Sequence, residues 1–288
     1  MLQTEPAFAK LNLTLDILGR RPDGYHDLNM VMQSIDLADQ VSLTVTAEEG
    51  LAVSADLPFL PQGEDNIAAK AALRFFQQLE QPRPGLAIRL EKRIPVCAGM
   101  GGGSSDGAAV LRILRRHFAP DMPQETLEAI AAQVGSDVPF CVRGGTVRAE
   151  GRGERMTDLP PLPPCHFVVC KPPCAVSTPE LFAQVRVKRL HCHPDGAGME
   201  AALAAGDLEG VAHRLYNGFE EVLPRRYCQV FEIKRQLLDL GAMASSMTGS
   251  GPTVFGMFRE EEPARQAAEA LRRQFAQTFY AKNTGPSV

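Results

Sequence analysis

The chain of 288 residues lacks an apolar run near the ~20 residues needed to cross a membrane, and it lacks the basic and apolar start of a signal peptide. We therefore expect a cytoplasmic protein with no membrane partner. It also lacks an excess of positive charge. The formal net charge is −4 and the pI about 5.9, so no global field favours nucleic acid. An anionic ligand must be bound by local groups.

No C-x-x-C pair occurs among the seven cysteines. Their odd number and irregular spacing exclude a regular disulfide framework and favour reduced thiols. Histidines lie near Cys165, Cys170, Cys174 and Cys192, but the tight spacing of a structural zinc site is missing. For this region we predict buried free thiols.

What the sequence does contain is a glycine cluster: five glycines lie within nine residues of PVCAGMGGGSSDGAAVLRIL, from Pro95 to Leu114. A P-loop is excluded because no lysine follows these glycines. The dinucleotide fingerprint G-x-G-x-x-G fails at Ser104. Gly103–Gly107 matches the hydrolase pattern G-x-S-x-G with Ser105 as nucleophile, but the segment before it cannot form the apolar strand that this pattern requires.

The remaining interpretation is a loop of bare backbone that opens a helix. Free N–H groups and the helix dipole make such a loop a phosphate site, and Ser104 or Ser105 could bind Mg²⁺ there. The alternative is a glycine-rich turn followed by a serine helix cap. A second glycine turn, TGSG at Thr248–Gly251, would support the phosphate site if it approached the same ligand.

Hydrophobic periodicity indicates a mixture of strands and helices without regular βαβ alternation, so we predict an α+β fold. Alternation over Ala9–Ile17 predicts a half-buried strand. The run LPPLPPC (Leu159–Cys165) predicts a boundary between two domains, 1–160 and 161–288. The other predicted strands are Met30–Leu37, Val41–Thr46, Leu86–Leu90 and Phe167–Cys170; the predicted helices are Asn66–Leu79, Ser104–Phe118, Pro123–Val134, Leu208–Val222, Tyr227–Leu240 and Pro263–Gln277.

The segment PVCAGMGGGSSDGAA resembles the central motif of the GHMP kinases, which bind ATP without a P-loop, and MTGSGPTVF (Met247–Phe255) resembles their C-terminal glycine motif. Two further segments are specific to fewer members of this superfamily: AFAKLNLTLDILGRRPDGYHDL (Ala7–Leu28) and GSDVPF (Gly135–Phe140). They resemble the members that phosphorylate a cytidyl-diphosphate polyol of the non-mevalonate isoprenoid pathway. The DGYH loop argues against a homoserine- or mevalonate-type kinase. The resemblance implies two domains, each a mixed or antiparallel sheet packed with helices, with the active site in the cleft between them.

The resemblance also implies roles for individual residues. The γ-phosphate of ATP would pass to a hydroxyl of the substrate, with Lys10 and Asp137 as the catalytic pair and Mg²⁺ as cofactor, for which Ser105 is a candidate ligand. The implied ATP-binding residues are Asn66, Lys92, Pro95, Gly99, Gly101, Gly102, Gly103, Ser104, Ser105, Asp106 and Thr178. Those implied for the small-molecule cytidyl-diphosphate substrate are Asn12, Tyr25, His26, Phe182, Thr248, Gly249 and Ser250. No obligate protein partner is evident.

Residue type alone gives less specific interpretations. Lys10 on an alternating strand is typical of a solvated face, and Asp137 could cap a turn before Pro139. His26 could be an exposed loop residue, and Phe182 a core residue. A non-catalytic ATP-binding regulator is the competing function from another class, and it is expected to lack the Lys10–Asp137 pair.

Overall fold

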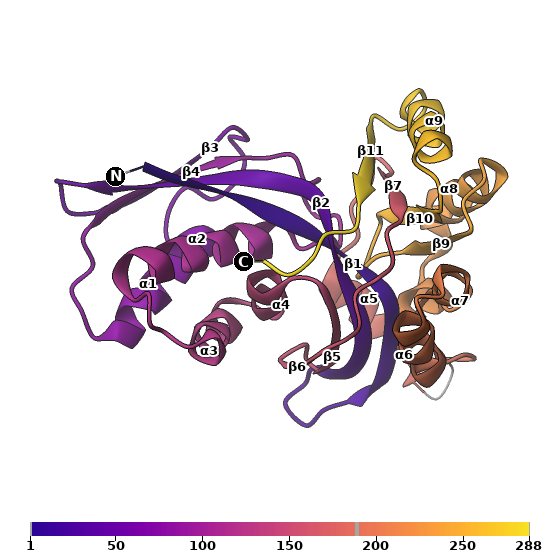
Figure 1. The fold of residues 1–288 in the computed structure, drawn as a ribbon, viewed down its shortest axis with the longest axis horizontal. Helices are drawn as coiled ribbons and strands as arrows, with labels where there is room; N and C mark the ends of the chain where they lie inside the picture. Colours follow the sequence, from indigo (N-terminus) through magenta and orange to yellow (C-terminus); the bar gives the residue numbers. More distant parts are fainter. Residues whose placement is uncertain (1, 188–189, 288) are drawn as a thin grey trace.

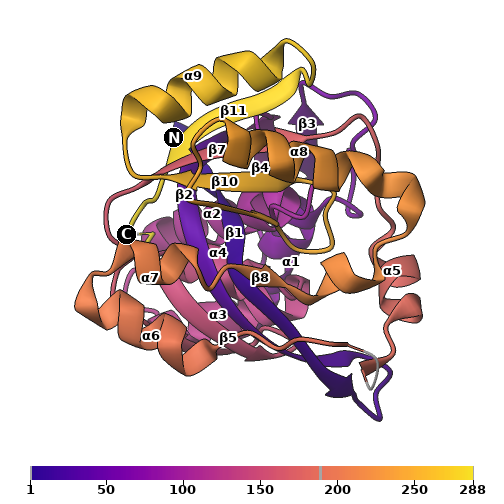
Figure 2. The same ribbon diagram turned by 90° about the vertical axis from the view of Figure 1, so that its right-hand side faces the viewer.

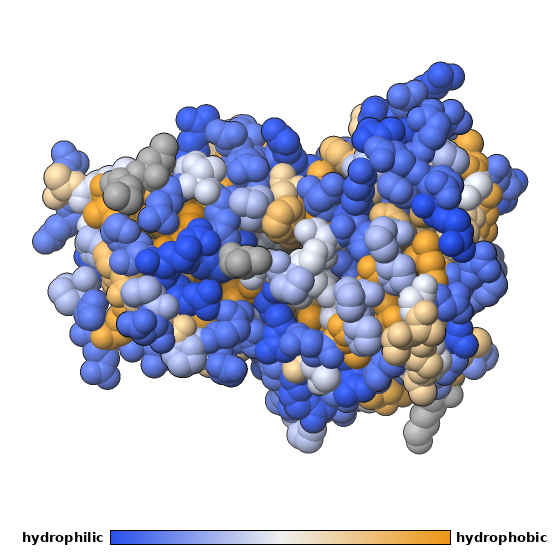
Figure 3. Space-filling view, in the orientation of Figure 1, coloured by the Kyte–Doolittle hydropathy of each residue, from blue (hydrophilic) through white to orange (hydrophobic). Residues whose placement is uncertain are grey.

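The structure is a computed structural model that describes residues 2–187 and 190–287. Two lobes lie side by side, each a sheet covered by helices, and the first two strands are long enough to run from one lobe toward the other (Figure 1). Hydrophilic side chains cover most of both lobes on the face drawn in Figure 3, with hydrophobic residues in separate small groups. In the described part of the chain, no helix combines the length and the apolar character needed to span a membrane.

The first lobe contains a seven-stranded sheet, and helices α1–α4 lie on one side of it (Figure 1). The strand order is β3-β4-β2-β1-β8, and β5 and β6 extend the other half of β2. The strands are β1 (Leu2–Arg20), β2 (His26–Thr46), β3 (Leu51–Ala55), β4 (Gly85–Glu91), β5 (Thr146–Gly151), β6 (Arg155–Asp158) and β8 (Tyr216–Asn217); the helices are α1 (Ile67–Leu79), α2 (Gly102–Phe118), α3 (Gln124–Val134) and α4 (Val138–Arg143).

The second lobe contains a four-stranded sheet in the order β11-β7-β10-β9, with α8 and α9 packed against it (Figure 2). Its strands are β7 (His166–Lys171), β9 (Ala244–Met247), β10 (Val254–Phe258) and β11 (Gln277–Lys282). Its helices are α5 (Thr178–Gln184), α6 (Gly196–Ala205), α7 (Leu208–Ala212), α8 (Cys228–Asp239) and α9 (Glu261–Arg272), with 3-10 turns at Gly218–Val222 and Arg225–Tyr227.

The α+β class is therefore confirmed. The division at residue 160 stays a proposal, because the chain returns to the first lobe beyond it. Strand β8 pairs with β1 in the first sheet, and the C-terminal segment forms bridges from Asn283 to Ile35 and from Pro286 to Gly144.

Several predicted elements differ from the structure. The two predicted strands between Met30 and Thr46 are one continuous strand, β2. The predicted helix Leu208–Val222 is wrong: α7 ends at Ala212, and β8 and a 3-10 turn follow. Helix α9 ends at Arg272, before β11 starts at Gln277. All seven cysteines are free; Cys165 and Cys170 are buried as predicted, whereas Cys174 is partly buried and Cys192 exposed.

Strand β1 is buried on both faces, where the alternation predicted one. Its apolar residues Ala9, Leu11 and Leu13 pack in a core shared with the second lobe. Its polar residues Lys10, Asn12, Thr14 and Asp16 are buried as well. Buried polar groups need partners, so this face of β1 must lie against other polar groups.

Candidate active site

Strand β1 places Lys10 and Asn12 in a locally irregular part of the sheet. The pairing of β1 with β2 shifts register between Phe8 and Lys10 and again between Asn12 and Thr14. Such irregularities bend a strand and re-aim its side chains. Lys10, with only 3% of its surface exposed, donates from Nζ to Asn12 Oδ1 at 2.7 Å. The solvated position expected from residue type alone does not occur.

Lys10 and Asp137 lie together. Lys10 Nζ is 3.5 Å from Asp137 Oδ2, and the Asp137 side chain is 35% exposed. Asp137 occupies the cap position of the short helix α4, but its side chain makes no capping hydrogen bond. Its carboxylate is therefore left to face the ammonium group. The two residues implied as the catalytic pair therefore form an ion pair between a buried lysine and a partly exposed aspartate.

The glycine segment forms a loop that leads directly into α2. Gly99 and Gly101 have φ of +73° and +72°, a left-handed conformation that glycine adopts without strain. The Lys10 amide donates to Met100 O at 3.0 Å, which ties this loop to β1. Helix α2 starts after Gly101 without a side-chain cap. Its first N–H groups and the positive end of its dipole have the features that bind phosphate at helix N-termini, so the phosphate loop stays a prediction that this geometry supports.

The second glycine turn packs against the first, backbone to backbone. A Cβ atom at Gly99 would lie 2.3 Å from Thr248 O, and one at Gly249 would lie 2.7 Å from Gly99 O. Asn12 links the second glycine turn to Lys10, because its Oδ1 accepts from Lys10 Nζ and, at 2.9 Å, from the Gly249 amide. The Asn12 amide donates to Thr248 Oγ1 at 3.1 Å. The turn thus approaches the same site as the phosphate loop.

A cavity of about 1300 Å³ opens between these segments. Small-molecule sites usually enclose roughly 300–1,000 Å³, so this one has room for two ligands. Twelve of the predicted site residues line it: Lys10, Asn12, Tyr25, His26, Gly99, Gly101, Ser104, Asp137, Thr178, Phe182, Gly249 and Ser250. The other predicted residues do not: Asn66, Lys92, Pro95, Gly102, Gly103, Ser105, Asp106 and Thr248.

Aromatic side chains form one end of the cavity. The His26 and Phe182 rings stack with centroids 4.7 Å apart, and Phe182 meets Phe219 edge to face. Burial lowers the pKa of His26, and the charge of Arg20 lowers it further. A neutral imidazole has one donor and one acceptor, which suits the edge of a nucleobase. Phe182 is therefore a wall of the cavity as well as a partner of the core.

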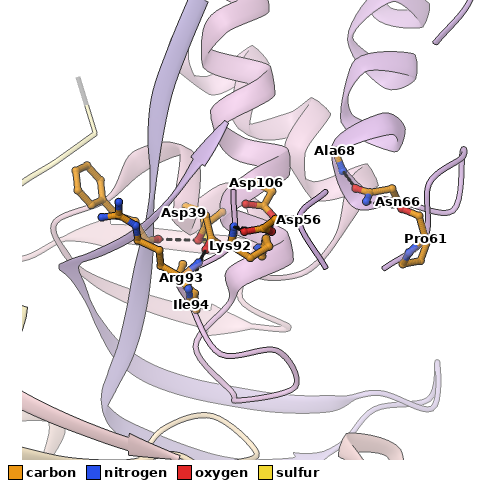
Figure 4. Close-up of polar contacts among 12 residues, drawn as sticks. Asp39, Asp56, Pro61, Asn66, Ala68, Lys92, Arg93, Ile94 and Asp106 are labelled. Atoms are coloured by element: carbon orange, nitrogen blue, oxygen red, sulfur yellow. Dashed lines mark hydrogen bonds and ion pairs between the residues drawn. The ribbon is translucent and has the colours of Figure 1, made fainter. Parts of the chain in front are cut away.

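The predicted adenosine contacts Lys92 and Asn66 do not line the cavity. Figure 4 shows the polar contacts that they make instead. Lys92 Nζ bonds to Asp39 and, at 2.5 Å, to Asp106 of α2. Asp39 also accepts from the amide of Ile94 at 2.8 Å. Asn66 caps α1 by accepting from the Ala68 amide. The contacts of Lys92 fix the segment before the glycine loop. That Lys92 or Asn66 contacts the nucleotide directly stays a prediction.

This cluster predicts a pH dependence of stability. Burial raises the pKa of Asp106 from 3.8 to about 7, against the opposing charge of Lys92. The folded chain therefore keeps a proton on Asp106 between pH 4 and 7 that the unfolded chain has released, so this group stabilises less as the pH rises through that range. We expect the difference in unfolding free energy between the wild type and Asp106→Asn to fall from pH 4 to 7, as measured by urea unfolding. A difference independent of pH would contradict the raised pKa.

Ser105 does not fit the two roles that its position in the motif suggested. Its hydroxyl is buried, donates to Phe8 O at 2.6 Å and contacts the Cys141 thiol. It does not line the cavity, whereas Ser104 does. No strand precedes it between Lys92 and Gly101, so the nucleophile elbow of a hydrolase is absent. Ser104 is thus the hydroxyl at the start of α2 that faces the cavity, and a role of Ser105 as a metal ligand stays a prediction.

The structure also identifies residues that the sequence patterns did not. Three arginines line the cavity: Arg20, Arg152 and Arg186. Asn217 is buried and donates from Nδ2 to Met247 O and Gly249 O, so it holds the second glycine turn. No pattern pointed to these residues. The arginines lie in loops and at element ends, and Asn217 lay inside a predicted helix.

Comparison with known proteins shows the family and the fold. The model of the GHMP kinases N terminal domain matches residues 66–145, and that of the GHMP kinases C terminal matches residues 199–277. A solved homoserine kinase from Cytophaga hutchinsonii has a TM-score of 0.72 at 19% identity, over 97% of this chain and 94% of its own, and shows a shared fold. The chain belongs to the GHMP kinases: it is a small-molecule kinase, and its phosphoryl donor is ATP.

Two closer similarities define the member. The 4-diphosphocytidyl-2-C-methyl-D-erythritol kinase of Pelotomaculum thermopropionicum is 42% identical over 288 residues, the whole of both chains. A crystal structure of 4-(cytidine 5'-diphospho)-2C-methyl-D-erythritol kinase has a TM-score of 0.84 at 34% identity, over 98% of this chain and 100% of its own. Within the GHMP kinases the chain is a member of the 4-diphosphocytidyl-2-C-methyl-D-erythritol kinase family.

Proposed function

We propose that this kinase transfers the γ-phosphoryl group of ATP to the 2-hydroxyl of 4-diphosphocytidyl-2-C-methyl-D-erythritol, a cytoplasmic step of the non-mevalonate isoprenoid pathway. The observation that carries this proposal is the Lys10–Asp137 ion pair, which lies in one cavity with the phosphate loop and with an aromatic end. A regulator that only binds ATP would not need an acceptor site beside the nucleotide.

In this mechanism Asp137 orients the acceptor hydroxyl and accepts its proton. Phosphoryl transfer through a loose transition state requires little proton removal beforehand, so positioning is the main task of the base. Because the Asp137 side chain is free of capping bonds and partly exposed, it can accept a hydrogen bond from a hydroxyl in the cavity. Asn12 and the ion pair fix where that hydroxyl must lie.

Lys10 stabilises the charge on the transferring group. Its ammonium group is held on one side by Asn12 and on the other by Asp137, with the stem packed under the glycine loop: a Cβ at Gly101 would lie 3.2 Å from Lys10 Cγ. A buried cation that needs no rearrangement during the reaction lowers the barrier more than a solvated one.

The phosphate loop would hold the β- and γ-phosphates of ATP on the N–H groups at the start of α2. The hydroxyls of Thr178 and Ser250 lie 2.6 Å apart at the cavity wall; Thr178 would contact the adenosine of ATP, and Ser250 the cytidyl substrate. The donor set also fits Mg²⁺, which is usually held by phosphates, water and one or two protein oxygens. Ser104 and Asp137 are the cavity groups that would hold it, and the ion would neutralise phosphate charge.

The test of this function is ATP turnover with and without the cytidyl methylerythritol substrate. We expect ADP formation to depend on that substrate, with homoserine and mevalonate as inactive controls. Protection by CMP or CDP in a thermal melt would support a cytidyl site independently of turnover. Turnover with homoserine or mevalonate in place of the cytidyl compound would overturn the proposal.

His26→Ala tests recognition of the cytosine ring. Because His26 lies at the aromatic end, away from the phosphate loop, we expect the KM for the cytidyl substrate to rise at least tenfold, the loss of one or two hydrogen bonds. The KM for ATP should change less than twofold, as measured by steady-state kinetics. Equal increases in the KM for the cytidyl substrate and the KM for ATP would exclude a specific role of His26 in cytosine recognition. His117→Ala is the matched control, since His117 lies on α2 outside the cavity.

A further inference from the structure

The charges that line the cavity are unevenly distributed. One carboxylate, that of Asp137, lies in the lining and already pairs with Lys10, whereas Arg20, Arg152 and Arg186 contribute three guanidinium groups. In the part of the chain that the structure describes, none of these three forms an ion pair with a carboxylate. Arg186 donates to the carbonyls of Ala183 and Val185. The Arg152 side chain donates no hydrogen bond to any described residue.

Arg152 lies in the turn between β5 and β6, and that turn packs against the acceptor end of the cavity. Its neighbours Gly151 and Gly153 have φ of +73° and +113°, so only glycine fits the turn without strain. A Cβ at Gly153 would lie 3.3 Å from the carbonyl oxygen of Ser136, the residue before Asp137. The backbone of Arg152 is therefore fixed close to the catalytic carboxylate.

The Arg152 side chain extends from this turn to the aromatic end. Its guanidinium carbon lies 4.3 Å from the centroid of the Tyr25 ring, and 53% of Tyr25 is exposed. A planar guanidinium that lies on a ring uses its face for that contact. Its N–H donors lie in its own plane and remain available at its edge.

In the substrate of the proposed function, a diphosphate joins the cytidine to the polyol that accepts the phosphoryl group. With the base at Tyr25 and His26 and the hydroxyl at Asp137, the diphosphate must lie between these two ends. The turn that carries Arg152 contacts both ends. A guanidinium fork matches two phosphate oxygens, and Arg152, whose turn contacts both ends, can offer one there.

We propose that Arg152 is a specificity-determining residue that binds the diphosphate of the cytidyl substrate while its face remains on Tyr25. This inference rests on the proposed function and adds to it the group that distinguishes a cytidine diphosphate compound from a plain cytidine. Arg20 and Arg186 line the same cavity and add positive charge to it.

The test compares cytidine, CMP and CDP as probes by titration calorimetry, with a non-hydrolysable ATP analogue present to fill the nucleotide site. We expect Arg152→Gln to weaken CDP binding by about tenfold or more, the loss of a charge-assisted hydrogen bond. Cytidine binding should change less than twofold. The KM for the cytidyl substrate should rise in parallel with the Kd for CDP, and the KM for ATP should not change. Arg152→Lys, which keeps the charge without the fork, should bind CDP with intermediate affinity.

Arg155→Gln is the matched control: it removes the same charge from the same hairpin at an exposed position outside the cavity, and we expect it to bind all three probes as the wild type does. Equal weakening of cytidine and CDP by Arg152→Gln would mean that Arg152 acts only through Tyr25, and would overturn the inference. Unchanged CDP binding would overturn it as well. If the wild type binds neither cytidine nor CDP, the proposed function itself fails.

Discussion

Asp137→Asn is expected to lower kcat by on the order of 100-fold or more, the contribution of a positioned base. The substitution keeps the size of the side chain and removes the charge that faces Lys10 at 3.5 Å. Because the side chain caps no helix, folding should not depend on it. Steady-state kinetics and a thermal melt give the two readouts.

Lys10→Met should have an effect of similar size, since it removes the cation that stabilises the transferring phosphoryl group. The two residues act as one unit, so the double variant should be little worse than either single one. Asp158→Asn is the control, because this carboxylate is 78% exposed and outside the cavity. Near-normal turnover in Asp137→Asn or Lys10→Met would refute the role assigned to that residue.

Gly99→Ala is expected to raise the KM for ATP at least tenfold and to lower the melting temperature. A Cβ at this position would lie 2.3 Å from Thr248 O. Thr248 O is a backbone atom, and the position of a Cβ is fixed by its own backbone, so no side-chain rotation can relieve the contact. Overpacking of this kind costs roughly 1–3 kcal/mol, and the left-handed φ of +73° adds about 1–2 kcal/mol for any other residue. The two glycine turns would have to separate, and the phosphate loop would move with them.

Gly206→Ala separates these two costs. Gly206 has a similar φ of +67°, but no atom lies within 4 Å of its added Cβ, and it is at the end of α6 outside the cavity. We expect it to lower the melting temperature less and to leave the KM for ATP unchanged. An unaltered KM in Gly99→Ala would show that the contact between the turns does not hold the phosphate loop.

Local patterns predicted the elements that support the site. Glycines followed by an amphipathic run predicted the loop and α2 in nearly the observed positions, because both depend on short-range backbone preferences. The predicted helix Asn66–Leu79 begins at the residue that caps α1 in the structure, for the same reason. The segment Leu208–Val222 was predicted as helix because its apolar residues have helical spacing. Asn217 instead bonds to the turn at Met247 and Gly249, a tertiary contact that no local pattern contains.

The proposal that Lys10 and Asp137 are the catalytic pair comes from resemblance alone, and a physical reason explains why. Lys10 and Asp137 are far apart in the chain, and each residue type is more common in a solvated or capping role. What gives them chemistry is the irregular register of β1 and the start of α4, which bring the two groups within 3.5 Å. Neither the local patterns nor the resemblance identified the arginines that line the cavity, because their positions depend on how a hairpin and two loops pack around it.

Asn12 gives the molecule a mechanical link between its halves. One carboxamide oxygen receives the ammonium of the first lobe and the amide of a turn in the second. A displacement of the second lobe by even about an ångström would therefore strain the hydrogen bond between Asn12 and the Lys10 ammonium group, which we propose to contact the transferring phosphoryl group. Substitutions in β9, β10 or α8 can then change the turnover number without touching either ligand, and the halves of this enzyme are expected to evolve as one unit.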